Sequence, residues 1–273
     1  MINSNKLHSS QKKALQDTVK NNFKSGVYFH ATGTGKSWIS LELIMLYNKL
    51  NHNHNVIWLC EKKSILNEQF NKITINNKGY QEIFNTFFII NFSENKPQDW
   101  FSRVNNASFW NKPILLIINR AFLVSKEKYK DIKIKIDVII HDECHSIKNK
   151  TTQDFYNFMI NKNSDIKCLG FSATPCFDFE PFKTTISKYT IYDAFKDKVI
   201  LPPKIVWVKS DNELTHTDII QICKMNIENL YYKKIIIWCG MIENCYYLSK
   251  LWSSIFKDFN VYIDTSKDND VDF

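Results

Sequence analysis

The chain has 273 residues, 44% of them hydrophobic and 23% charged, which is ordinary for a soluble globular protein. This length suits one large domain, or one domain and part of another. The formal net charge of +8 suits a polyanionic partner but does not prove one.

Seven cysteines are scattered along the chain without a C-x-x-C pair, so a reducing compartment fits better than a disulfide framework. The polar start, Met1–Gln16, lacks the apolar core of a signal peptide. The strongest apolar runs, such as Ile114–Ile118, have the length of strands rather than of membrane spans. We expect a soluble, intracellular protein of the cytoplasm, the nucleus or a virus-infected cell, with no membrane partner.

Short apolar runs alternate with longer amphipathic stretches in the first two thirds of the chain. Six runs are typical of buried strands: Val27–Phe29, Val56–Leu59, Phe87–Ile90, Ile114–Ile118, Val138–Ile140 and Cys168–Phe171. Helical patterns follow Lys36 and cover Ile65–Phe70. This alternation predicts an α/β fold with a parallel sheet covered by helices on both faces.

Leu201-Pro202-Pro203 interrupts the pattern, because two prolines fit neither a central strand nor a helix interior. The alternation then restarts as strand, helix, strand, helix, strand: Ile205–Val208, Thr217–Tyr232, Ile235–Trp238, Ile242–Phe256 and Val261–Ile263. We therefore predict a first domain over residues 1–203 and the beginning of a second α/β domain over residues 204–273.

The strongest motif is His30-Ala31-Thr32-Gly33-Thr34-Gly35-Lys36-Ser37, between a predicted strand and a predicted helix. Its two glycines let backbone N–H groups converge on phosphate oxygens, and the helix N-terminus adds partial positive charge. Lys36 can reach the β- and γ-phosphates of ATP, and the Ser37 hydroxyl can ligate Mg²⁺. The alternative is an ordinary glycine turn, and the outermost Gly or Ala of the general pattern is His30 here.

A second motif, Val138-Ile139-Ile140-His141-Asp142-Glu143-Cys144-His145, ends a buried strand in two adjacent acids. Ligands of parallel sheets bind at the carboxyl ends of strands, so these acids should face the phosphate loop. Asp142 can then hold Mg²⁺, and Glu143 can orient or deprotonate the attacking water. Two alternatives stay open: zinc ligation by the two histidines and the cysteine, and simple capping of the next element.

A third motif, Leu169-Gly170-Phe171-Ser172-Ala173-Thr174-Pro175, ends a strand in small hydroxyl residues and is weak when taken alone. Together the three pieces resemble motifs I, II (as "DECH") and III of the superfamily 2 helicases, in the same order. The resemblance is closest to the motor subunits of type III restriction enzymes. It implies a RecA-like P-loop domain followed by the beginning of a second RecA-like domain.

Weaker segments fit the same family. Gln11 resembles the glutamine that reads the adenine edge of ATP. Val56–Cys60 and the following residues resemble motif Ia, which would place Lys62 and Lys63 on a nucleic-acid backbone, and Arg120 follows a segment that resembles motif Ib. For these three basic residues, a solvated face is at least as good an interpretation as a phosphate contact.

The resemblance continues through Ile191–Pro203, similar to the family's crossing between motor domains, and Lys234–Cys239, similar to motif IV. Motifs V and VI, with the arginines that complete the ATP site, have no place before Phe273. We therefore expect slow hydrolysis by this chain alone, since an arginine finger typically contributes ~10³ to 10⁵ in rate. A longer chain, a separate polypeptide or a truncated gene would each account for this.

The resemblance also assigns roles within the ATP site. ATP would lie on Gln11 and Thr32–Ser37, with Mg²⁺ on Ser37 and Asp142, and with Lys36 and Glu143 as catalytic residues. Three further residues would relay the presence of the γ-phosphate to the nucleic-acid groove: His145, Ser172 and Thr174.

The predicted function is an ATP-dependent helicase or translocase acting on DNA or RNA. The alternative is an ATP- and nucleic-acid-binding regulatory module that does not unwind. The order of the acid pair and the Ser-Ala-Thr segment argues against a nucleotide kinase or a small GTPase.

Overall fold

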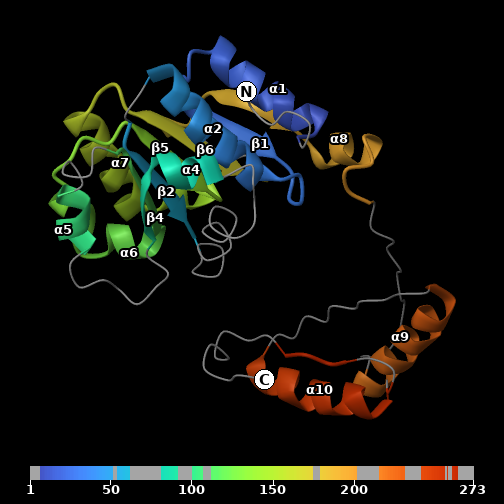
Figure 1. The fold of residues 1–273 in the computed structure, drawn as a ribbon. Coiled ribbons are helices and arrows are strands. Elements are labelled where there is room, and N and C mark those ends of the chain that lie inside the picture. Colours follow the sequence, from blue (N-terminus) through green and yellow to red (C-terminus); the bar gives the residue numbers. More distant parts are fainter. Residues whose placement is uncertain are drawn as a thin grey trace. The chain divides into compact units, whose positions relative to one another are not determined.

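A computed structural model describes residues 7–51, 54–61, 81–91, 100–106, 112–174, 179–201, 215–230, 241–255, 257 and 260–263 (Figure 1). Its contacts divide the chain into two compact units, Met1–Pro203 and Lys204–Phe273. Each unit is described by itself.

The first unit is built on one seven-stranded sheet with the order β3-β4-β2-β5-β6-β1-β7, and every neighbouring pair is parallel. The strands are β1 (Gly26–His30), β2 (Val56–Cys60), β3 (Phe88–Asn91), β4 (Ile114–Asn119), β5 (Val138–Asp142), β6 (Lys167–Ser172) and β7 (Thr185–Tyr189). An all-parallel sheet of this kind is the α/β architecture that the alternation predicts.

Most helices of the first unit connect these strands, whereas α1 (Ser9–Lys20) precedes the first strand and α8 (Ile191–Lys196) follows the last (Figure 1). The others are α2 (Lys36–Asn51), α4 (Gln81–Thr86), α5 (Trp100–Asn105), α6 (Arg120–Val124) and α7 (Lys150–Lys162), with 3₁₀ segments η3 (Ser125–Asp131) and η4 (Cys144–Lys148). The longest of them, α2, begins at the lysine of the phosphate loop, as predicted.

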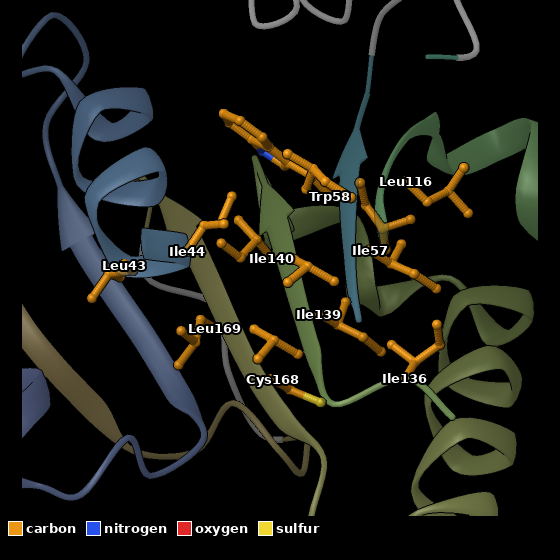
Figure 2. Packing of buried hydrophobic residues seen from close by; sticks show 14 of the residues in the cluster. Leu43, Ile44, Ile57, Trp58, Leu116, Ile136, Ile139, Ile140, Cys168 and Leu169 are labelled. Atoms are coloured by element: carbon orange, nitrogen blue, oxygen red, sulfur yellow. The ribbon is translucent and has the colours of Figure 1, made fainter. Parts of the chain in front are cut away.

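The core of this unit lies between the strands and the helices packed on them. All residues of β2 and β5 are buried, because these strands occupy the middle of the sheet. Figure 2 shows Ile44 of α2 in one cluster with Ile140 of β5 and Leu169 of β6. Continuous Ile, Val and Leu runs are what a strand covered on both faces requires.

Six of the seven strands fall where the sequence predicts them, although β3 begins one residue later than the predicted Phe87–Ile90. The seventh, β7, was not predicted. Its sequence Thr185–Tyr189 mixes polar and apolar residues because it is an edge strand paired only with β1. The helix predicted at Ile65–Phe70 lies outside the described residues.

The second unit contains α9 (His216–Leu230) and α10 (Ile242–Ile255), close to the predicted helices. Ile220 and Trp252 are buried together between other apolar side chains of this unit. The strand predicted at Val261–Ile263 is wrong, since this segment has no regular secondary structure and Tyr262 is largely exposed. The predicted strands at 205–208 and 235–238 lie outside the described residues.

In the described part of the chain, none of the helices combines the length and the apolar character needed to cross a membrane.

Candidate nucleotide-binding site

The three predicted motifs come together at one edge of the sheet, because β5, β6 and β1 are consecutive neighbours and run parallel. The phosphate loop follows β1, the hydroxyl residues end β6, and the acid pair ends β5. Phe29 of β1 pairs with Ser172 of β6, and Phe171 pairs with Asp142 of β5. The carboxyl ends of these strands therefore form the kind of crevice where parallel sheets bind ligands.

The phosphate loop has the backbone conformation that its glycines allow. Gly33 and Gly35 have φ angles of 82° and 81°, in the left-handed region that other residues rarely adopt. Between them, the Thr34 hydroxyl donates a hydrogen bond of 2.6 Å to the carbonyl of Ala31 and closes the turn. Helix α2 starts directly afterwards at Lys36, so the positive end of its dipole lies at the loop.

The side chain of Gln11 in α1 is hydrogen-bonded to this loop. Its side-chain nitrogen donates to the carbonyls of Thr34 at 3.1 Å and Gly35 at 3.4 Å, and its oxygen accepts from the backbone N–H of His8 at 2.9 Å. The side chain is buried, and a methyl group added at Gly35 would collide with its nitrogen. In this structure the amide thus holds the loop in place, and recognition of adenine by Gln11 stays a prediction.

His30, the unusual first residue of the loop, is fully buried and turned toward β7. Its Nε2 lies 3.0 Å from the Ser187 hydroxyl, and its ring lies 5.8 Å from that of Tyr189. Burial, with the positive charge of Lys36 adding to it, lowers the pKa of His30 to about 4. A neutral histidine therefore fills space between β1 and β7 at a position where the general pattern has only Gly or Ala.

The catalytic pair predicted from the sequence is in contact. Lys36 Nζ lies 3.4 Å from Glu143 Oε1, although 106 positions separate the two residues in the chain. The other oxygen of Glu143 lies 3.4 Å from Nδ1 of His145. Asp142 is buried at the end of β5, and Glu143 has a left-handed backbone with φ 54° and ψ 50°. The structure thus places lysine, acid pair and histidine in one cluster.

Ser172 and Thr174 form a small hydroxyl cluster beside this site. Ser172 is buried at the end of β6, and its Oγ lies 3.3 Å from Oγ1 of Thr174 and accepts a hydrogen bond from the Thr174 N–H at 3.2 Å. This short turn orients both hydroxyls at the strand end next to the phosphate loop. Their coupling role stays a prediction.

The oxygen donors of the site suit Mg²⁺. The Asp142 carboxylate and the Ser37 hydroxyl are hard ligands, and Mg²⁺ is usually bound by one or two such groups together with substrate phosphates and water. Zinc is a different case. His141 is engaged with Tyr156 and Glu61, and His145 contacts Glu143. In the described ranges, no three His, Cys, Asp or Glu side chains converge on a metal position.

One feature of the site escaped prediction: Glu61, directly after β2, binds Arg120. Arg120 donates to the two carboxylate oxygens at 2.5 Å and 3.0 Å, and to Thr152 at 2.9 Å, and its side chain is only 11% exposed. The structure therefore gives Arg120 internal partners, and its contact with nucleic acid stays a prediction. Lys62 and Lys63 lie outside the described residues.

Comparisons with known proteins give the family and the fold of the chain. The family model for the type III restriction enzyme res subunit matches residues 4–177. The sequence matches none of the curated proteins.

Two solved structures are similar in fold. One is a nuclease-deletion mutant of the Type ISP restriction-modification enzyme LlaGI in complex with a DNA substrate mimic, at 17% identity and a TM-score of 0.52 over 95% of this chain and 25% of that chain. The other is the ATP-dependent Type ISP enzyme LlaBIII bound to DNA, at 18% identity and a TM-score of 0.51 over 71% of this chain and 16% of that chain. The present chain thus spans a quarter or less of either enzyme. From the family match over most of its length, the chain belongs to the type III restriction enzyme res-subunit family, within the superfamily 2 helicases.

Proposed function

We propose that this chain is the ATP-hydrolysing motor part of a helicase or translocase that moves on DNA or RNA. The contact of 3.4 Å between Lys36 Nζ and Glu143 Oε1 carries the proposal. This contact supports the proposal because a phosphate-loop cation and the acid of a DECH box would both act on one γ-phosphate. A structural ion pair alone would not need a glycine loop with two left-handed residues beside it.

In the proposed reaction, the N–H groups of the loop and of the α2 N-terminus bind the phosphates. Lys36 leaves Glu143 and binds the β- and γ-phosphate oxygens, which frees the Glu143 carboxylate. Glu143 then orients a water in line with the γ-phosphate and accepts its proton. Asp142 and Ser37 would hold Mg²⁺, which when bound neutralises charge on the phosphate oxygens.

We infer that His145, Ser172 and Thr174 pass on a change at the γ-phosphate. His145 contacts the second oxygen of Glu143, so movement of that carboxylate changes its surroundings. Since family motors close two domains around ATP, we propose that unwinding or translocation requires a complete second motor domain, supplied by more chain or by another polypeptide.

DNA is the first polymer to test, since the LlaGI and LlaBIII structures both contain DNA. The experiment is steady-state ATPase activity of the 273-residue chain, alone and with single-stranded DNA, duplex DNA or RNA. Binding of a fluorescent ATP analogue is measured in parallel, so that binding and turnover are separated.

Two variants test the roles proposed for Lys36 and Glu143. Lys36→Ala should abolish tight ATP binding, because its ammonium contacts the phosphates. Glu143→Gln should bind ATP and fail to turn it over. ATPase activity retained in Glu143→Gln would remove the role proposed for Glu143, and a wild-type chain that binds no ATP would refute the function as a whole.

A further inference from the structure

Glu61 lies at the centre of a partly buried polar cluster that the ATP reaction does not use directly. Its Oε1 accepts hydrogen bonds from Arg120 Nε at 2.5 Å and from the Ser146 hydroxyl at 2.7 Å, and lies 3.2 Å from His141 Nε2. Its backbone carbonyl accepts from Asn119 Nδ2 at 2.8 Å. One residue thus joins the ends of β2 and β4 to β5 and η4.

The protonation states in this cluster follow from the contacts. Burial raises the pKa of Tyr156 well above its ordinary value, so its hydroxyl keeps the proton and donates to His141 Nδ1 at 2.9 Å. His141 is fully buried, with Nδ1 facing the Tyr156 hydroxyl and Nε2 lying 3.2 Å from Oε1 of Glu61, so both ring nitrogens have polar partners. Each donor therefore meets an acceptor, as a stable buried network requires.

The cluster holds the acid pair from both sides. His141 directly precedes Asp142 and Glu143, and Ser146 follows them on η4. The side chains of His141 and Ser146 contact the same oxygen of Glu61. Between these two anchors, Glu143 has a left-handed backbone (φ 54°), which costs free energy for a residue other than glycine. Such a conformation persists only where its surroundings enforce it, and the two anchors do so.

We propose that Glu61 is a positioning residue of the ATP site, whose carboxylate fixes the turn that carries Asp142 and Glu143. The inference rests on the function proposed above. Glu61 touches neither nucleotide nor reacting water in this role, and it acts through His141 and Ser146. Residues of this kind, one step removed from a metal ligand, typically change metal affinity or activity ~10- to 100-fold when replaced.

The test compares the wild-type chain with Glu61→Gln, which keeps the size of the side chain but removes its charge. Binding of mant-ATP is titrated with Mg²⁺ and again with EDTA, and the ratio of the two affinities is the readout. For Glu61→Gln we expect this ratio to fall about tenfold or more, with the affinity in EDTA nearly unchanged, because Asp142 loses its position while the phosphate loop does not. Where turnover is measurable, kcat should fall and KM for Mg·ATP should rise with the weaker binding.

Glu82→Gln is the matched control, since Glu82 is an exposed residue that pairs with Lys49 at 3.1 Å. It should leave the ratio unchanged. Ser146→Ala removes one anchor and leaves the pair of Glu61 and Arg120 intact, so it carries the test if Glu61→Gln does not fold. We expect a smaller loss in the same direction.

The outcomes separate the two proposals. If the wild-type chain binds no mant-ATP under either condition, the proposed function fails and this inference fails with it. If the wild-type chain binds and both variants keep the wild-type Mg²⁺ ratio and kcat, Glu61 is a structural residue only and this inference alone is overturned. A merely structural role would lower the unfolding temperature without changing the ratio.

Discussion

His30 should make the stability of the first unit depend on pH. Its ring is fully buried, and its pKa falls from the ordinary 6.5 to about 4 in the folded chain. Between these two values the unfolded chain binds a proton at this residue and the folded chain does not, so protonation favours unfolding. Stability is therefore fully present above pH 6.5 and is lost as the pH falls toward 4.

The size of this loss follows from the two pKa values. A difference of about 2.5 pKa units corresponds to roughly 3 kcal/mol once titration is complete, and about 2 kcal/mol of it should already be lost at pH 5. The assay is urea unfolding at pH 7, 6 and 5 for the wild-type chain and for His30→Asn. Asn does not titrate and is still able to bond to Ser187.

We expect the wild-type chain to lose about 2 kcal/mol more than His30→Asn between pH 7 and pH 5. Taking the difference between the two proteins cancels the titration of all other groups. His30→Ala, which restores a residue of the general phosphate-loop pattern, should show the same pH dependence as His30→Asn. A constant difference between wild type and both variants across this range would refute the reasoning, since it would mean that the pKa of His30 is the same in the folded and the unfolded chain.

Three further predictions follow from the site. Gly35→Ala should abolish binding of a fluorescent ATP analogue, because the residue has φ 81° and its new methyl group would collide with Gln11; binding at wild-type affinity would contradict this. Partial burial raises the pKa of Glu61, but hydrogen bonds from His141, Arg120 and Ser146 outweigh it and lower the pKa from 4.5 to about 2, so Glu61→Gln should cost on the order of 1 to 2 kcal/mol in urea unfolding at pH 7 once solvent screening of this partly exposed carboxylate is included. That stability is present above pH 4.5 and lost as the pH falls toward 2, so the gap between the two proteins should narrow in acid. Arg120→Gln should leave the salt dependence of single-stranded DNA binding unchanged in fluorescence anisotropy, because Arg120 is committed to Glu61; a slope smaller by ~0.7 would instead identify a phosphate contact.

The phosphate loop and the acid pair are predictable because their chemistry is local. Gly33 and Gly35 are needed where they stand, since the backbone there has positive φ, and the acids must end a strand. Parallel strands then bring the two segments to one edge of the sheet, which is a property of the fold class and needs no detailed model. The contact between Lys36 and Glu143 was therefore within reach of sequence reasoning.

The Glu61 cluster was beyond such reasoning, because its members are far apart in the sequence and the motif-like segments around them do not predict their mutual contact. Glu61, Arg120 and His141 meet only because β2 lies between β4 and β5, an order that the pattern of apolar runs does not specify. The edge strand β7 was not predicted for a related reason. With one neighbour only, it needs fewer apolar residues, and its sequence therefore does not stand out from a loop.

The sheet order also places β5 between the strands that carry the two groups of polar residues. On one side it faces β6 and, beyond it, β1, whose ends carry the hydroxyl cluster and the phosphate loop. On the other side it faces β2 and β4, whose ends carry Glu61 and Arg120. The acid pair at its end therefore lies between the residues of the proposed ATP site and the polar cluster around Glu61. The Glu61 carboxylate thus links the ends of β2 and β4 to the turn that carries Glu143, whereas Lys36 links the phosphate loop to Glu143 directly.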